Sequence, residues 1–365
     1  MKRTFVVLGG AGAIGKIAVR DLFESRKDNH ILIADFNVDA ARAYAKSFRS
    51  ARVRAAFADA SKPAAFAKSL RGCAVVVNCA QHHFNLHVMK AALSARVHYA
   101  DLGGLFVWTR KQLKLNAAFK RAGLTAVLGA GCSPGITNVM AMYAARKLGR
   151  VASVRIRVGA RDFNPRPAGF VFPYSAQTIV EEMTLPPWVY ERGAFRELKP
   201  RTRWERVAFG KPVGTVWTVC TRHSEIATLP LTLRAHGIRA CDFKVNFDRP
   251  FVNELVKRMK AGWTVKDFAK LPAPRGKPDD CETARVIVEG GGRRITMDCH
   301  AKAKPRWHAS AGDIDTGCPP SIVAQMIADG AITARGVLAP ELAIPDGKFF
   351  RELKERGMRI TETGE

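Results

Sequence analysis

Gly10-Ala11-Gly12-Ala13-Ile14-Gly15 follows an apolar, strand-like run at residues 4–8 and opens a stretch with helical periodicity at residues 13–25. A glycine loop between a strand and a helix is the pattern of a dinucleotide-binding turn. Gly10 would permit the tight turn, Gly12 the approach of a pyrophosphate, and Gly15 close helix packing. A plain turn built from small residues is the alternative. The loop residues expected to contact the cofactor are Gly10, Gly12, Ala13, Ile14 and Gly15.

Strand-like and helical stretches alternate through the first 130 residues. Further strands are expected at 30–34, 53–57, 73–77, 97–100 and 125–128. The helices between them are expected at 39–48, 63–70, 84–95 and 107–122. Strict β–α alternation with right-handed connections predicts an α/β fold, a Rossmann doubly wound parallel sheet with helices on both faces.

The pattern changes after residue 150. A stretch at 151–160 alternates as a half-buried strand does, and helical stretches follow at 252–261 and 322–328. Further strands are expected at 215–219, 240–246, 284–288 and 294–299. These features predict a second α+β domain with a mixed or antiparallel sheet. We expect a dinucleotide-binding domain at 1–135, a substrate and oligomerisation domain at 136–320, and a C-terminal segment at 321–365.

The composition is that of a globular protein, with 47% hydrophobic and 25% charged residues in 365. The first apolar run ends at Gly9, too early for a secretion signal, and no stretch approaches the ~20 apolar residues of a membrane span. The eight cysteines are scattered without a Cys-x-x-Cys pair. We therefore expect a cytoplasmic protein with reduced thiols, no structural metal and no membrane partner.

The formal net charge of +27 is unusual. A nucleic-acid or anionic-membrane partner is one interpretation, but the basic residues are interspersed and form no basic tail or RNA-binding motif. A field that attracts an anionic cofactor and carboxylate substrates is a second interpretation. A solvated arginine-rich surface is the third, and the even spread of charge favours it over a nucleic-acid partner.

Two aspartates follow strands of the predicted sheet. Asp35 lies 20 residues after Gly15, where a carboxylate accepts both ribose hydroxyls and repels the 2′-phosphate of NADP. This placement favours NAD over NADP, although Arg42 lies close in sequence. Capping of the helix that begins near Asn37 is the alternative role for Asp35. Asp59 follows the third strand and would contact the adenine or begin a loop.

Asn78 and Cys79 end the fourth strand. Ligands of open α/β sheets bind beyond the carboxyl ends of the strands, so both residues are candidates for the nicotinamide side of the site. Capping of the loop is the alternative for Asn78. His82 and His83 come next in the chain. Either one would act in catalysis or would lie in a solvated loop.

Several motifs, in this order, resemble the saccharopine dehydrogenase-like family, which includes lysine 6-dehydrogenase, saccharopine reductases and carboxynorspermidine dehydrogenase. Val75–Ala80 with Phe84-Asn85 is similar to the family's fourth-strand turn, and His98–Gly104 to its H-x-x-D-L-G-G signature. Gly131–Asn138 is similar to its G-x-x-P-G-x-x-N turn, and Gly330–Glu341 to the lysine 6-dehydrogenase ending. Together these motifs span almost the whole chain.

The resemblance implies a Rossmann domain, an inserted second domain and a C-terminal return to the first. It also implies an NAD(P)-dependent dehydrogenase of the lysine 6-dehydrogenase type, with reversible hydride transfer at a CH–NH bond of an amino acid or related amine. A saccharopine- or carboxynorspermidine-type imine reductase is the alternative within this class. A non-enzymatic dinucleotide-binding or nucleic-acid-associated protein is the alternative of another class. The second-domain sheet would pair across a two-fold axis in a homodimer.

The resemblance also suggests site residues in the first domain. Asp101, Leu102 and Gly103 match the family segment at the junction of cofactor and substrate. The Asp101 carboxylate would steer the amine or stabilise an iminium; its alternative role is to cap the next helix and bond loop amides. Cys132, in the Pro-Gly turn, would contact the cofactor or substrate, or be a small packed thiol.

Thr221-Arg222-His223-Ser224-Glu225 is the candidate segment of the second domain. Arg222 fits bidentate binding of a substrate carboxylate, His223 fits proton exchange near neutral pH, and Glu225 fits recognition of an amine. A loop and helix cap before Ile226 is the alternative for all three. Lysine 6-dehydrogenase carries a smaller, more polar segment here, and this departure puts lysine in doubt as the substrate.

Overall fold

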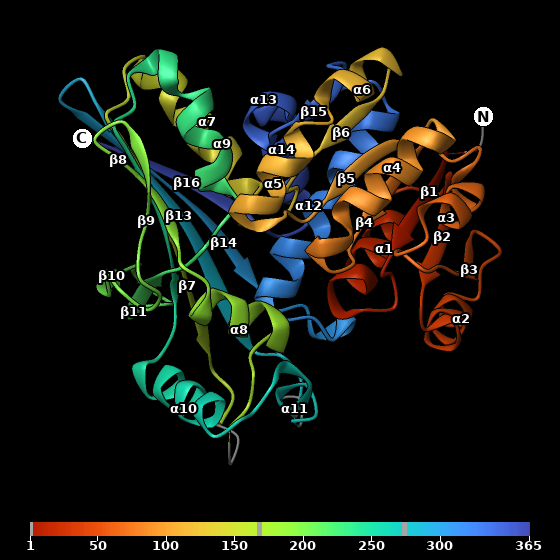
Figure 1. Cartoon of the computed structure of the whole chain (residues 1–365), viewed down its shortest axis with the longest axis horizontal. Helices are drawn as coiled ribbons and strands as arrows, with labels where there is room; N and C mark the ends of the chain where they lie inside the picture. Colours follow the sequence, from red (N-terminus) through yellow and green to blue (C-terminus); the bar gives the residue numbers. More distant parts are fainter. Residues whose placement is uncertain (1–2, 166–169, 272–275) are drawn as a thin grey trace. The chain divides into compact units, whose positions relative to one another are not determined.

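The computed structural model describes residues 3–165, 170–271 and 276–365 (Figure 1). The chain forms two compact units. The first comprises Met1–Tyr143 with Gly312–Arg359, and the second Ala144–Ala311 with Ile360–Glu365. Among the described helices, none combines the length and apolar character that a membrane crossing requires.

The first unit contains a seven-stranded sheet in the order β15-β6-β5-β4-β1-β2-β3. Every strand pair in it is parallel. The strands are β1 (Arg3–Leu8), β2 (Asn29–Asp35), β3 (Val53–Phe57), β4 (Val75–Asn78), β5 (His98–Asp101), β6 (Thr125–Val127) and β15 (Gly336–Leu338). This order confirms the predicted Rossmann fold, and the buried runs Phe5–Leu8 and Val75–Val77 explain why these strands read as continuously apolar.

The helices of this unit follow the expected alternation with one exception. They are α1 (Ala13–Ser25), α2 (Val38–Ser47), α3 (Pro63–Leu70), α4 (Asn85–Ala95), α5 (Leu105–Leu113), α6 (Asn116–Arg121), α13 (Pro340–Ala343) and α14 (Asp346–Glu355). The single helix expected at 107–122 is wrong, because the chain breaks between α5 and α6. At the break the Asn116 side chain accepts a hydrogen bond from Val337 N at 3.0 Å. A bond to a strand 221 residues later leaves no trace in local periodicity.

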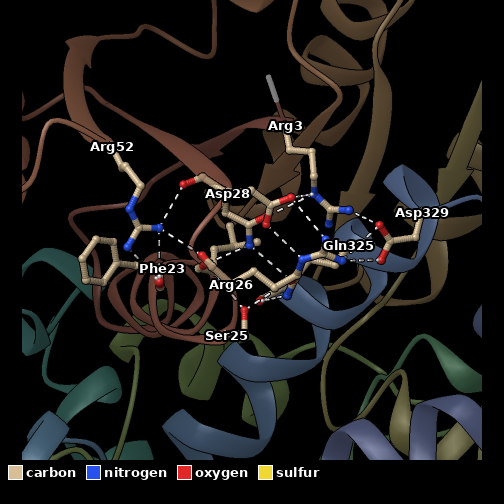
Figure 2. A network of polar contacts seen from close by, with 11 residues as sticks. Arg3, Phe23, Ser25, Arg26, Asp28, Arg52, Gln325 and Asp329 are labelled. Atoms are coloured by element: carbon tan, nitrogen blue, oxygen red, sulfur yellow. Dashed lines mark hydrogen bonds and ion pairs between the residues drawn. The ribbon is translucent and has the colours of Figure 1, made fainter. Parts of the chain in front are cut away.

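The C-terminal return is joined to the N-terminal βα unit by polar contacts (Figure 2). Gln325 lies on α12 (Ala311–Ala328), and its Oε1 accepts from Ser25 Oγ at 3.2 Å and Asn29 Nδ2 at 3.1 Å. Asp329, just after this helix, pairs with Arg3 and with Arg26, the latter at 3.3 Å. These bonds tie residues about 300 positions apart into one unit.

A buried ion pair lies nearby. Arg356 Nε lies 2.8 Å from both carboxylate oxygens of Asp21 on α1. Ser321 of α12 donates to the same carboxylate at 2.5 Å, and Glu352 of α14 pairs with Arg356 at 2.7 Å. Both charged partners of the central pair are almost fully buried. One carboxylate therefore connects the first helix with the last two long helices of the chain.

The second unit contains a mixed sheet in the order β10-β11-β12-β7-β13-β14-β16, with β8 and β9 as a hairpin beside β12. Its strands are β7 (Ser153–Asp162), β8 (Trp188–Glu191), β9 (Ala194–Glu197), β10 (Glu205–Ala208), β11 (Thr215–Cys220), β12 (Ala240–Asn246), β13 (Asp280–Gly290), β14 (Arg293–Lys302) and β16 (Arg359–Gly364). The β7–β12 pair is parallel and the β7–β13 pair antiparallel, which confirms the predicted α+β unit with a mixed sheet.

The remaining helices are α7 (Ile136–Leu148), which contains the boundary between the units, and α8 (Ala176–Thr184), α9 (Glu225–Thr232), α10 (Arg249–Lys260) and α11 (Val265–Phe268) of the second unit. An apolar cluster joins α8, α10 and α11 through Ile179, Leu255 and Phe268. The α8 helix begins at the cap Ser175, whose side chain accepts from Thr178 N.

Candidate functional site

The glycine loop presents the start of α1 without a side-chain cap. Gly12 is its N-cap residue, and it accepts the first helical bond from Lys16 N at 2.9 Å. Within the described part of the chain, no hydrogen-bond acceptor is found for the N–H groups of Ala13, Ile14 and Gly15. Three such N–H groups at the positive end of a helix form an anion-binding site.

The loop has no room for side chains at two of its glycines. A Cβ on Gly15 would lie 2.1 Å from Gly9 O and 2.7 Å from Gly10 Cα. A Cβ on Gly10 would lie 2.9 Å from Val7 O. The backbone is therefore packed against itself as a dinucleotide-binding turn requires, and the residues present fit the pyrophosphate of a dinucleotide.

Asp35 lies against this loop. Its Oδ2 accepts from Ala11 N and its Oδ1 from Asn37 N, both at 2.9 Å. Asn37, and not Asp35, caps α2, since its side chain accepts from Ala40 N at 3.0 Å. Arg42 pairs with Asp39 at 3.3 Å. The carboxylate of Asp35 is thus oriented at the end of β2, beside the turn.

Two aromatic side chains beside Asp35 were missed in the sequence analysis. Phe36 is 72% exposed and Phe57, the last residue of β3, is 55% exposed, with their ring centroids 5.6 Å apart. The signal that would have revealed them is an aromatic residue at the end of each of two neighbouring strands. Asp59 lies in the turn after β3, where its carboxylate accepts two hydrogen bonds from Ser61 that lower its pKa. These bonds fit its alternative role at the start of a loop.

The end of β4 lies against the glycine loop. A Cβ on Gly9 would lie 3.0 Å from the carbonyl of Cys79. Burial raises the pKa of the Cys79 thiol to about 12, so it is protonated at neutral pH. Asn78 is buried, donates to Asn85 Oδ1 at 2.8 Å and accepts from Ala80 N at 3.1 Å. Asn78 therefore shapes the turn after β4, as its alternative role requires.

Asp101 is fully buried at the end of β5, and each of its oxygens accepts two hydrogen bonds. Oδ1 accepts from Gly103 N at 2.9 Å and Gly129 N at 2.7 Å. Oδ2 accepts from Tyr99 Oη at 2.8 Å and Gln112 Nε2 at 2.6 Å. Burial raises the pKa of Asp101, and these four bonds act in the opposite direction. The arrangement supports its alternative role of bonding loop amides.

The loop that Asp101 holds contains Leu102 and Gly103 and continues into α5. Leu105, the first residue of α5, has a φ of 50°, a left-handed value that is uncommon for a branched side chain. His82 lies near this helix, with its ring centroid 6.3 Å from that of Trp108. The structure thus brings His82 close to α5, whereas His83 is exposed.

Cys132 lies in a tight turn before α7 and is buried. A Cβ on Gly135 would lie 2.1 Å from Gly131 O, so only glycine fits there. Asn138 holds the turn, accepting from Gly135 N at 3.0 Å and donating to Glu341 at 2.8 Å. The Asn of this motif therefore connects the turn to the C-terminal return.

In the second unit the structure brings His223 and Glu225 together. His223 Nδ1 lies 2.5 Å from Glu225 Oε2, and the imidazole stacks on Phe243 with centroids 3.8 Å apart. Arg222 has other partners: its Nε donates to Pro186 O at 2.7 Å, and its Nη2 lies 3.5 Å from Glu197. Burial lowers the pKa of Arg222.

Glu182 and Tyr174 join this group, and of the two Glu182 was missed from sequence. The Tyr174 hydroxyl donates to Glu182, and burial raises the pKa of the Glu182 carboxyl to about 6. His223 and Glu182 are coupled electrostatically, each acting on the other's pKa. The sequence signal for Glu182 is a pair of adjacent glutamates at positions 181 and 182.

Comparison with known proteins extends these findings. The family model of the saccharopine dehydrogenase NADP-binding domain matches residues 5–127, and that of the saccharopine dehydrogenase C-terminal domain matches residues 131–358. Carboxyaminopropylagmatine dehydrogenase of Synechocystis sp. is 24% identical, over 97% of this chain and 96% of its own. Carboxynorspermidine synthase of Vibrio cholerae is 25% identical, over 49% of this chain and 44% of its own.

A solved structure of saccharopine dehydrogenase (L-Glu forming) from Saccharomyces cerevisiae has the same fold, with a TM-score of 0.74, full coverage of both chains and 16% identity. The two family models together cover nearly all of the chain. The resemblance inferred from its motifs is confirmed. The chain belongs to the saccharopine dehydrogenase family and is a nicotinamide-dependent oxidoreductase.

Proposed function

We propose that this enzyme acts at the CH–NH bond of a secondary amine that also carries a carboxylate, in the amine-oxidising or the imine-reducing direction. The His223–Glu225 pair carries the proposal, because a partly exposed imidazole with one nitrogen fixed by a carboxylate suits proton exchange with an amine nitrogen. Two relatives are named after carboxylated amines, carboxyaminopropylagmatine and carboxynorspermidine, and these names support the proposed substrate class. Lysine itself fits less well than such an amine.

The first unit would hold the cofactor, which supplies or accepts a hydride when bound. The pyrophosphate would bind at the N–H groups of the glycine loop, and the adenosine ribose at Asp35. Because a carboxylate there repels a 2′-phosphate, we propose NAD rather than the NADP of the family model's name. Phe36 and Phe57 would flank the adenine.

The nicotinamide would lie at the ends of β4 and β5, near Asn78, Cys79 and the loop Leu102–Gly103. Asp101 would act by holding this loop, since all four of its hydrogen bonds go to its own unit. A direct catalytic role for Asp101, and contacts of Asp59 and Cys132 with the cofactor, stay predictions.

The second unit would bind the substrate. The Arg222 guanidinium would pair with the carboxylate of the substrate. It would do so by giving up its long contact with Glu197. Arg222→Met is then expected to raise KM for a carboxylated amine by about 10- to 100-fold. The same change should leave KM for the matching amine without the carboxylate nearly unaltered. An equal loss with both substrates would show that Arg222 acts only through the fold, by its bond to Pro186.

Turnover of NAD and NADP tests the overall proposal. Purified enzyme is mixed with each oxidised cofactor and a panel of carboxylated secondary amines, and in reverse with each reduced cofactor, an aldehyde and an amino acid. Absorbance of the reduced nicotinamide reports the reaction. Absence of turnover in both directions, from protein that binds the reduced cofactor, would refute the proposed substrate class. A preference for NADP would refute the role given to Asp35.

We also propose a cytoplasmic homodimer. The eight cysteines are free thiols in the structure, which suits a reducing compartment. The wide sheet of the second unit offers a surface for two-fold pairing. Light scattering on the eluting protein gives its mass directly, and a mass near 40 kDa would refute the dimer.

A further inference from the structure

His223 interacts with two carboxyl groups from two different helices. Glu225, from the first turn of α9, is bonded to Nδ1 at 2.5 Å and is fully buried. Glu182, from α8, is 5% exposed and acts electrostatically on the imidazole. Tyr174 donates to Glu182 and so favours its ionised form. One histidine thus has a direct and a more distant anionic partner within the second unit.

Other aromatic and charged groups also act on His223, Glu182 and Tyr174. Phe243 of β12 covers one face of the imidazole, with an interplanar angle of 13°. Glu181 is the other charged group that acts on Glu182, and Glu282 of β13 acts on Tyr174. No cation besides His223 itself appears among the groups that set the pKa values of Glu182 and His223 within the described residues.

The geometry leaves one nitrogen of His223 for chemistry. Glu225 fixes Nδ1, and stacking on Phe243 fixes the plane of the ring. Over residues 3–165, 170–271 and 276–365, no hydrogen-bond partner of Nε2 is found, and the side chain keeps 12% of its surface exposed. The orientation of this nitrogen is therefore determined by the fold before any substrate binds.

We propose that Glu182, positioned by Tyr174, acts with Glu225 to keep His223 protonated, and that Nε2 delivers this proton to the substrate nitrogen when the enzyme reduces an imine. Glu182 is a positioning residue, and His223 is the catalytic acid. The inference rests on the proposed function and adds that the enzyme works in the imine-reducing direction. A protonated imidazole donates a proton, as imine reduction requires, whereas amine oxidation would need a neutral imidazole to accept one.

The proton balance follows from the reaction. Hydride addition to the carbon of the C=N bond places the π electron pair on nitrogen, which then takes the proton from Nε2. His223 is left neutral and regains a proton from water, so each turnover consumes one hydride and one proton. In the reverse direction the imidazole must first lose its proton, which two neighbouring carboxylates oppose.

The electrostatics of the array agree with this assignment. Burial by itself lowers the pKa of a histidine, because it disfavours the charged form. The two carboxylates overcome that effect, so that the pKa of His223 lies above its ordinary value. Removing one of them should therefore lower it.

The first test is an NMR titration of the histidine side chains, with the His223 signal assigned by its absence from His223→Asn. Glu182→Gln and Tyr174→Phe should each lower the pKa of His223, by about 0.5 to 1 unit for the glutamine. Glu254→Gln, which removes a carboxylate on α10 that pairs with Arg258 at 2.7 Å, should not change it. An unchanged His223 pKa in both test variants would overturn the role of Glu182.

The second test is the pH profile of imine reduction. The alkaline limb of kcat/KM should shift to lower pH in Glu182→Gln by the same amount as the pKa of His223, with little change on the acid side. His223→Asn should lower kcat by about 10²- to 10⁴-fold. A uniform fall at every pH would indicate damage to the fold and refute the proton-holding role. Should the wild-type enzyme reduce no imine, the proposed function fails, and the titration still decides whether Glu182 holds the proton.

Discussion

Gly15→Ala should damage cofactor binding and stability together. The added Cβ would lie 2.1 Å from the carbonyl oxygen of Gly9 and 2.7 Å from the Cα of Gly10, and all of these are backbone atoms. Because the overlap is with backbone and not with a flexible side chain, it is relieved only if the turn opens or α1 shifts. Space is also short at Gly10, where an added Cβ would lie 2.9 Å from Val7 O, so the shift has to spread through the loop.

The size of the effect follows from this overlap. Overpacking by one methyl group in a tight interior costs about 1–3 kcal/mol, and backbone overlap places Gly15→Ala at the upper end. If the loop relaxes by moving the N–H groups of Ala13 and Ile14, the phosphate site changes as well. A loss of about 2 kcal/mol in binding corresponds to a roughly 30-fold weaker Kd for the reduced cofactor.

Gly347→Ala is the matched control. Gly347 is also in the first turn of a helix, α14, and the nearest atom to its added Cβ is a guanidinium nitrogen of Arg351 at 3.8 Å. Alanine there should be neutral or stabilise the protein by about 0.5–1 kcal/mol. Fluorescence titration with the reduced cofactor gives Kd, and urea unfolding gives stability. Equal behaviour of the two variants would refute the structural account of the loop.

Three further predictions concern other parts of the structure. Asp21→Asn leaves Arg356 without its buried carboxylate and should cost about 3 kcal/mol in urea unfolding, whereas Asp28→Asn, which removes an exposed partner of Arg26, should cost far less; equal losses would contradict this. Phe36→Ala should weaken binding of the reduced dinucleotide and leave reduced nicotinamide mononucleotide, which lacks adenine, unaffected; weaker binding of both would exclude a contact with adenine. Burial raises the pKa of Glu182 in the folded protein to about 6, from an ordinary value of 4.5 that applies to the unfolded chain. As the pH rises between these two values, the unfolded chain loses the proton first, so the free energy of unfolding should fall by about 2 kcal/mol. Glu182→Gln should remove that fall, measured by unfolding at a series of pH values, and an unaltered pH dependence would argue against the raised pKa.

Much of the first unit was predictable because its signals are local. The run Phe5–Leu8, the glycine loop and the alternation of strands and helices all lie within short windows of sequence, where burial on both sheet faces and helical periodicity leave direct patterns. The strand order also follows from the handedness of β–α–β connections. The break between α5 and α6 was not predictable, since Asn116 is held there by Val337 from the far end of the chain.

The candidate site divides in the same way. The sequence was sufficient to predict the glycine turn between β1 and α1, the position of Asp35 at the end of β2 and the family. The tertiary structure was needed to show that the Asp101 carboxylate accepts hydrogen bonds from four groups of its own unit, that Phe36 and Phe57 are neighbours, and that Glu182 acts on His223. The reason is physical: hydrogen bonding, exposure and pKa depend on groups brought together from distant segments, and local patterns of residues do not record which segments meet.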